Sequence, residues 1–309
     1  MKPEMKDDME DKMKSKLKER IGGMLRNQWY LMIHSGGFWL AFLLMLGFTL
    51  GGFLHNVKNS WGENTQELWT AINMTALGGG RADDFVCLLA LVVSLSFAAS
   101  YIADRHYRVT DCILSRTDRR IYLEAKFIIC FIGSFLIAAV PLLADALLCA
   151  VTFPNNDNYM FGAAGTADYA VYLSGASQTY ASVSPAMGLV KLFLFSPWLY
   201  YLVYVLLFSV FSGMLGILVL AVSCWLPLHK VLLLFPAGLL IFLTRAADER
   251  LFFEAAHRPE TVYINLSVAD YFIPFSRSGQ NVWVILGAIV CLFLFCWISM
   301  RHVWKTERI

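Results

Sequence analysis

The side chains best placed for chemistry in this sequence are Glu254 and His257, three residues apart in a predicted helix. At that spacing they would share one helical face and could bind a metal ion. No third ligand is evident nearby, so a solvated amphipathic helix explains the pair better, and we predict no metal site. The chain also has neither H-E-x-x-H nor G-x-x-x-x-G-K-[ST], the motifs of zinc proteases and P-loop ATPases. We therefore expect no catalytic residue and no cofactor bound by this chain.

Asp145 is the one acidic residue inside a long apolar run. Ionisable residues at such positions are candidates for handling a substrate or a proton. Asp145 lies 18 residues after Phe127, or about 27 Å along a helix, which places it near the outer membrane surface, where hydration lowers its cost. Three aromatic residues of a later run could line the same path, although an interfacial aromatic belt explains them equally well. They are Trp198, Tyr201 and Tyr204.

The densest group of charged residues is the segment 104–126, which reads D-R-H-Y-R-V-T-D-C-I-L-S-R-T-D-R-R-I-Y-L-E-A-K. Thr110 can cap one short helix, and Thr117 can cap the next, which leads into an apolar run. A short amphipathic element rimmed by arginines is suited to docking on a protein partner, whereas positive-inside topology alone would give a similar pattern. The docking residues that we predict are Arg108, Asp111, Ile113, Leu114, Arg116, Asp118, Arg119, Arg120, Tyr122, Glu124 and Lys126.

The composition places the chain in a membrane. It is 58% hydrophobic and 16% charged, whereas a soluble domain is about half apolar and a quarter charged. The apolar residues form runs, and about 20 helical residues suffice to cross the hydrocarbon. We predict an all-α membrane protein with six transmembrane helices, at about 38–54, 85–102, 127–153, 197–225, 231–243 and 282–300. The fourth is expected to begin with Ser196 as N-cap and Pro197 at the first helical position.

Two amphipathic regions flank these predicted spans. In the N-terminal segment, apolar residues recur every four positions, which predicts a helix lying on the membrane or on a partner. They are Met5, Met9, Met13, Leu17 and Ile21. The pieces 251–256 and 268–275, between the fifth and sixth spans, are predicted to be re-entrant or outer-surface helices, since irregular backbone at membrane depth needs shelter. The chain thus divides into a cytoplasmic amphipathic helix, 1–36, and a single transmembrane domain, 37–309.

Basic residues near the span ends predict the orientation. The loop between the second and third spans is rich in arginine, while the connection 154–190 has no Lys or Arg. We therefore expect both termini in the cytoplasm, and we expect no nucleic-acid partner. Gly47 and Gly51 form G-x-x-x-G in the first span, a spacing that lets helices approach closely. This motif could mark a dimer face or packing within one chain.

The order of elements, with the stretch I-L-S-R-T-D-R-R-I-Y-L-E-A-K-F, resembles a permease of the type 2 ATP-binding-cassette (ABC) exporter class. The resemblance implies a multi-pass subunit of a bacterial cell membrane that pairs with itself or with a sister permease. It also implies a separate cytoplasmic ATPase subunit, which binds ATP and Mg²⁺ and whose motion the basic loop receives. The implied cargo is amphiphilic: a peptide, a drug or a lipid.

Two other classes of protein remain open on the sequence alone. One is a non-transporting immunity or sensor protein, which would bind a peptide at the connection 154–190 and signal through the basic loop. The other is a membrane-embedded enzyme that uses outer-surface residues and is active without an ATPase. Its candidate residues are Asp248, Glu249, Glu254 and His257.

Overall fold

Helices make up the regular structure of this chain. A computed structural model describes residues 19–63, 71–78, 81–97, 100–101, 104, 118–154, 189, 192, 195–225, 232, 235–257, 266–274 and 282–306, and no strand occurs among them. Residues 19–33 form an N-terminal helix. The elements that follow are α2 (Gly36–Asn59), α3 (Ala82–Leu95), α6 (Arg119–Thr152), α9 (Pro197–Trp225), α10 (Phe235–His257), the 3-10 helix η5 (Ala269–Phe272) and α11 (Val282–Thr306).

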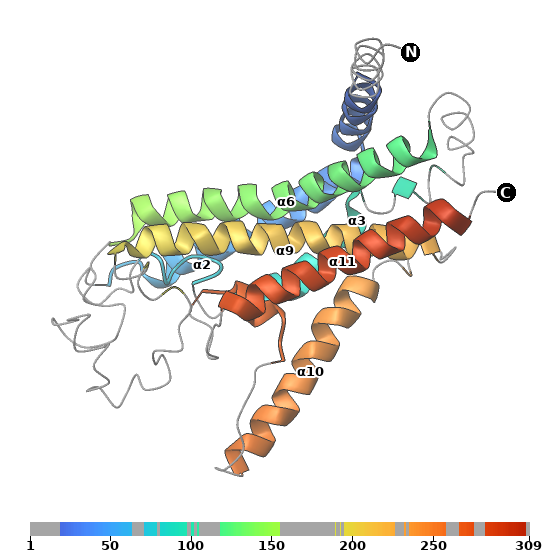
Figure 1. Cartoon of the computed structure of the whole chain (residues 1–309). Helices are drawn as coiled ribbons and strands as arrows, with labels where there is room; N and C mark the ends of the chain where they lie inside the picture. Colours follow the sequence, from blue (N-terminus) through green and yellow to red (C-terminus); the bar gives the residue numbers. More distant parts are fainter. Residues whose placement is uncertain are drawn as a thin grey trace, which may run out of the picture.

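The helices α6 and α9 run side by side through the centre of a bundle, with α2, α3 and α11 packed around them (Figure 1). In the described part of the chain, three helices are long and apolar enough to cross a membrane: Gly36–Asn59, Arg119–Thr152 and Pro197–Cys224. The third is the most enclosed by protein, and large apolar side chains of α2 and α11 face outward. These features are compatible with a membrane protein. We call the two ends of the bundle the Arg119 end and the Thr152 end, after the ends of α6.

Small residues bring α6 and α9 into close contact. A Cβ atom on Gly216 would lie 2.1 Å from Ser134 Oγ, and one on Gly213 would lie 2.5 Å from the Phe131 ring. Ser212 Oγ donates a hydrogen bond to the Ser134 carbonyl at 2.7 Å. Small side chains and hydrogen bonds between helices are the usual means of association where lipid removes the hydrophobic driving force.

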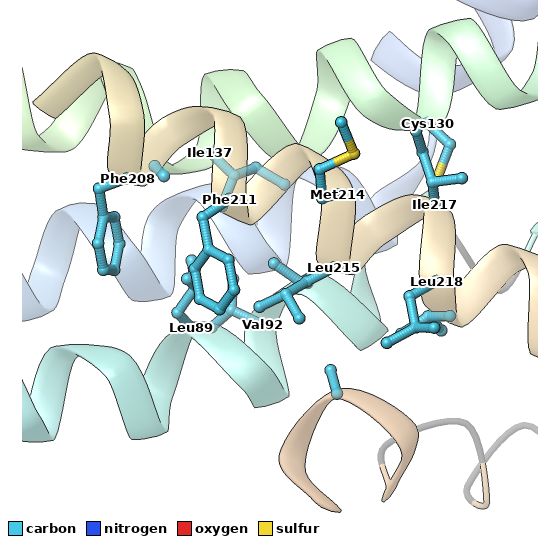
Figure 2. Close-up of a cluster of buried hydrophobic side chains, with 14 of the residues drawn as sticks. Leu89, Val92, Cys130, Ile137, Phe208, Phe211, Met214, Leu215, Ile217 and Leu218 are labelled. Atoms are coloured by element: carbon cyan, nitrogen blue, oxygen red, sulfur yellow. The ribbon is translucent and has the colours of Figure 1, made fainter. Parts of the chain in front are cut away.

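The core is continuous across α3, α6 and α9 (Figure 2). Its labelled side chains project from all three helices into the space between them: Leu89, Val92, Cys130, Ile137, Phe208, Phe211, Met214, Leu215, Ile217 and Leu218. The N-terminal helix joins this core through Met32, whose Sδ would lie 2.6 Å from a Cβ on Gly133 of α6. This helix therefore packs against its own chain, at least over its described residues.

The bounds of the fourth predicted helix agree with the structure, and the bounds of the other predicted helices differ from it. The helix α9 spans 197–225 as expected, and Leu199 N donates to Ser196 Oγ at 3.4 Å, as an N-cap requires. The apolar run 127–153 is only part of α6, which begins at Arg119 and contains Pro141. The first and last predicted helices, 38–54 and 282–300, are extended to Gly36–Asn59 and Val282–Thr306.

The prediction of a fifth helix at 231–243, with a separate piece at 251–256, is wrong. One unbroken helix, α10, runs from Phe235 to His257. Its charged residues mark a change of surroundings along the helix rather than a helix end. The piece 268–275 does contain a short helix, η5.

The prediction of a long second helix at 85–102 is also wrong. The helix α3 has only 14 residues, which makes it about 21 Å long. Its first turn lies at half height in the bundle, because Phe85 contacts Phe48 and Phe208, with ring centroids 6.1 and 5.4 Å away. The segment 71–78 occupies part of the space beyond it, toward the Thr152 end.

Candidate functional site

The base of the basic loop is closed by a buried ion pair. The Lys126 side chain of α6 is 0% exposed, and its ammonium group donates a hydrogen bond to the Asp104 carboxylate. The Tyr122 hydroxyl donates to the same carboxylate oxygen at 2.6 Å, and Lys126 Nζ lies 3.1 Å from that hydroxyl. Since Asp104 precedes the loop and Lys126 follows it, the pair ties the two stems together.

Three aromatic rings surround the Lys126 ammonium. Their centroids lie 5.3 Å (Tyr122), 5.5 Å (Phe97) and 5.8 Å (Tyr101) from Nζ. A cation over the face of an aromatic ring is attracted by the ring quadrupole, most strongly where water is excluded. A buried lysine needs such compensation, since an unpaired charge in a protein interior is strongly destabilising. We name the group Asp104, Tyr122 and Lys126, with the rings of Phe97 and Tyr101, the loop latch.

The structure divides the predicted docking residues into two sets. Tyr122 and Lys126 are buried and contact the Asp104 carboxylate, so in this conformation they do not face a partner. Asp118, Arg119, Arg120 and Glu124 lie on the outer side of the first turns of α6. Arg120 and Glu124 form an exposed ion pair with a separation of 2.8 Å. The remaining docking residues lie outside the described part of the chain: Arg108, Asp111, Ile113, Leu114 and Arg116.

Sequence reasoning missed three members of the latch. Asp104, Phe97 and Tyr101 were not among the predicted residues, although all three lie just before the loop. A lysine directly before an apolar run is typical of an exposed side chain at the end of a membrane span, so the sequence does not predict that Lys126 is buried. The available signal was the spacing Tyr122–Lys126, which places a hydroxyl one turn from the ammonium on the same helical face.

Asp145 anchors a turn at the Thr152 end. Its Oδ2 accepts a hydrogen bond of 2.7 Å from the backbone N–H of Ala76, and its side chain is 2% exposed. The same segment, 71–78, is held by two more contacts: Ala71 N donates to Pro154 O at 3.0 Å, and Asn56 Nδ2 donates to Met74 O at 2.7 Å. Asp145 thus acts as an acceptor for a buried backbone donor.

Replacing Asp145 separates an anchoring role from proton handling. Asp145→Asn keeps an acceptor oxygen, so we expect nearly normal stability and, if the chain transports, an unchanged pH dependence of transport. Asp145→Ala leaves the Ala76 N–H unpaired and should lower the free energy of unfolding by about 1–3 kcal/mol. Chemical denaturation in detergent measures the stability, and an altered pH profile in Asp145→Asn would contradict the anchoring role.

Two of the three aromatic residues proposed for a membrane path, Tyr201 and Tyr204, are fully buried in the core. Trp198 is half-buried and packs against Tyr201 with ring centroids 6.3 Å apart. In this conformation Tyr201 and Tyr204 do not line an open surface. Gly47 and Gly51, the two glycines of the G-x-x-x-G motif, are both exposed on α2. A Cβ atom at either position would have no neighbour within 4 Å. The G-x-x-x-G motif therefore does not pack against the described part of the same chain.

A second ion cluster joins three elements at half height. Arg245 of α10 pairs with Asp83 in the first turn of α3, and its Nη2 lies 3.6 Å from Asp270 Oδ1 of η5. The sequence analysis did not single out these residues. Arg245 and Asp83 are 162 positions apart, so no local pattern relates them.

The described residues contain no group of three or more His, Cys, Asp or Glu side chains that could hold a metal ion. Glu254 and His257 lie in α10, but their side chains are outside the described set. Comparison with known proteins found no matching family model, no matching curated protein and no matching solved structure.

Proposed function

We propose that the chain is the transmembrane permease subunit of an ABC exporter of the type 2 class. It would move an amphiphilic cargo, such as a peptide, drug or lipid, with ATP hydrolysed by a separate subunit. The observation that carries the proposal is the loop latch. Asp104, which precedes the arginine-rich segment, is paired with Lys126 of α6, a helix of 34 residues. At about 51 Å, α6 exceeds the hydrocarbon thickness of about 30 Å.

This connection suits the transfer of motion from a partner into the membrane. The latch holds both stems of the loop, so a push on the loop moves the Arg119 end of α6 rather than the loop alone. Contacts of α6 with α9 pass the displacement to the core, because the two helices touch closely at Gly213 and Gly216. The residue-level resemblance in the stretch 116–127 supports a docking role for the same loop.

The proposed topology has six crossings with both termini in the cytoplasm of a bacterial cell. The N-terminal helix, the start of α6 and the C-terminal end of α11 lie at one end of the bundle (Figure 1). This arrangement supports an even number of crossings. The crossings added to the three long apolar helices would be made by α3, α10 and α11, with α3 and α10 completed by neighbouring segments.

Two partners follow from the proposal. The first is a cytoplasmic ATPase, which would hold ATP and Mg²⁺ and contact the loop together with Arg119 and Arg120. The second is another copy of this chain or a sister permease. The exposed apolar face of α2, with Gly47 and Gly51 at its centre, is suited to that contact because small residues allow close helix packing.

Charge reversal in the loop tests the function. In the triple variant Arg116→Glu, Arg119→Glu and Arg120→Glu, three attractive contacts to an acidic or polar partner surface become repulsive. We expect a loss of at least about tenfold in the ATPase recovered with the chain from native membranes, and a similar loss of ATP-dependent transport. Arg301→Glu, an exposed change at the same end of the bundle, is the control and should retain both. Normal coupling in the triple variant would reject the proposal.

A further inference from the structure

Two elements mark the middle of the bundle. Phe48 and Phe211 lie at the midpoints of α2 and α9, both long enough to cross a membrane. Phe85, in the first turn of α3, contacts Phe48. Phe272 of η5 stacks on Phe211 with ring centroids 4.6 Å apart. The start of α3 and the short helix η5 therefore lie at the same level, half way along α2 and α9.

Charged side chains gather at that level. Asp83 and Asp84 occupy the first turn of α3 beside Phe85, and Asp270 precedes Phe272 by two residues. Arg245 links Asp83 to Asp270. Asp83 is 69% exposed even with this partner, and Asp84 is also exposed.

Lipid is a poor environment for this cluster. The carboxylates of Asp83, Asp84 and Asp270 outnumber the guanidinium groups even when Arg81, the N-cap of α3, is counted with Arg245. A charged side chain at mid-depth in hydrocarbon is costly. Intramembrane ionisable residues almost always face a bundle interior or a water-filled space. The exposed side of Asp83 has no shelter among the described residues, so water is the occupant that its charge requires.

The helix α10 changes character at the same level. Before Arg245 its outward side chains are apolar and suited to lipid: Phe235, Leu239, Phe242 and Leu243. After it come Asp248, Glu249 and Arg250, and Asp248 Oδ1 accepts a hydrogen bond of 2.8 Å from Leu266 N. The His257 end of α10 diverges from the bundle (Figure 1). The same half also carries the exposed apolar side chains of Leu251 and Phe253, so it is amphipathic, and its charged side needs water where it leaves the bundle at this level.

We propose that water reaches from the Thr152 end of the bundle to its middle, past η5 and the charged part of α10, as far as the first turns of α3. The inference deepens the proposed function and rests on it, since it assumes that α2 and α9 cross the membrane. The water-filled space passes Asp83, Arg245 and Asp270 and ends one turn further along α3, at Cys87. It gives a polar or charged part of an amphiphilic cargo a route to the middle of the membrane.

Two native cysteines allow a direct test. Cys87 is exposed one turn after Asp83 on the same face of α3, close enough to Arg245 for electrostatic interaction. Cys291 is exposed at the middle of the apolar stretch Trp283–Ser299 of α11 and serves as the matched control. A sulfonated methanethiosulfonate does not cross membranes and reacts with thiolates, which form in water. The thiolate displaces methanesulfinate and forms a mixed disulfide with the reagent.

The experiment uses the unmodified chain in intact cells. The reagent is added outside, and the extent of labelling at each cysteine is read by mass spectrometry of its peptides. Labelling after denaturation gives the maximum for each site. We expect Cys87 to be labelled at least about tenfold faster than Cys291, because the charged reagent reaches a thiol in water and is excluded from lipid.

The other outcomes overturn different claims. If both cysteines resist the reagent until denaturation, Cys87 faces lipid or protein, and the inference is wrong while the proposed function stands. If both react rapidly in native membranes, the chain is not embedded as proposed, and the proposed function fails with the inference. Faster labelling of Cys291 than of Cys87 would also reject the inference.

Discussion

Asp104→Ala is expected to lower the free energy of unfolding by about 3–5 kcal/mol, the cost of leaving a buried charge without its partner. The variant leaves the Lys126 ammonium at 0% exposure with only aromatic rings and the Tyr122 hydroxyl around it. The Tyr122 hydroxyl also loses its acceptor. Denaturation in detergent micelles, followed by circular dichroism, measures the change.

A double variant and a surface control test the cause. Asp104→Ala with Lys126→Met removes both charges, so it should cost clearly less than the sum of the two single variants. Arg120→Gln breaks the exposed pair with Glu124, in which the Arg120 side chain is 68% exposed, and should change stability by no more than about 0.5 kcal/mol. Additive effects of the Asp104 and Lys126 variants would show that the latch does not act as a unit.

Gly216→Val is expected to separate α6 from α9 and to cost about 3 kcal/mol, the upper end of the usual range for overpacking. A Cβ at Gly216 would lie 2.1 Å from Ser134 Oγ and 2.7 Å from Ser134 Cβ, so the clash is with the root of a side chain and not with a flexible tip. The contact lies at the centre of the bundle. The yield of folded protein in detergent and the denaturation midpoint should both fall.

Gly287→Val provides the matched control, since Gly287 lies in α11 with no atom within 4 Å of its Cβ position. That variant should fold as well as the natural chain. The variant Gly216→Ala combined with Ser134→Gly should be more stable than Gly216→Ala alone, because Ser134→Gly removes the two atoms that the new methyl group meets most closely. Equal stability of the Gly216→Val and Gly287→Val variants would contradict the close approach of α6 and α9.

Local signals in the sequence were enough to predict the helix α9. Ser196 followed by Pro197 is a strong start signal, and a long apolar run after it leaves only one continuation. The helix α10 was harder. The apolar run before Arg245 ends where polar residues begin. This change predicts a helix end, although the helix continues to His257. Hydrophobic runs report the surroundings of a helix, not its length.

The two ion clusters could not be predicted from the sequence. In one of them the paired residues are far apart along the chain, and in the other the lysine fits the common pattern of basic residues at the ends of membrane spans. Nothing near Asp83 indicates Arg245, and the pairing depends on how α3 and α10 pack. Lys126 fits the positive-inside pattern, which accounts for a basic residue at the end of a span. That pattern does not predict whether the side chain points into the protein or into water. The sequence proposes Asp145 for a transport path, which stays a prediction, and it cannot show that the Asp145 carboxylate accepts a hydrogen bond from the Ala76 N–H.

Pro141 divides α6 into two mechanical parts. A proline has no N–H, so the Ile137 carbonyl loses its partner within the helix, and the backbone bends more easily at this point. The part before it carries Lys126, while the part after it carries Asp145. A torque applied at the Arg119 end can therefore be taken up as bending at Pro141, so that the part of α6 before Pro141 moves while the part after it keeps its place.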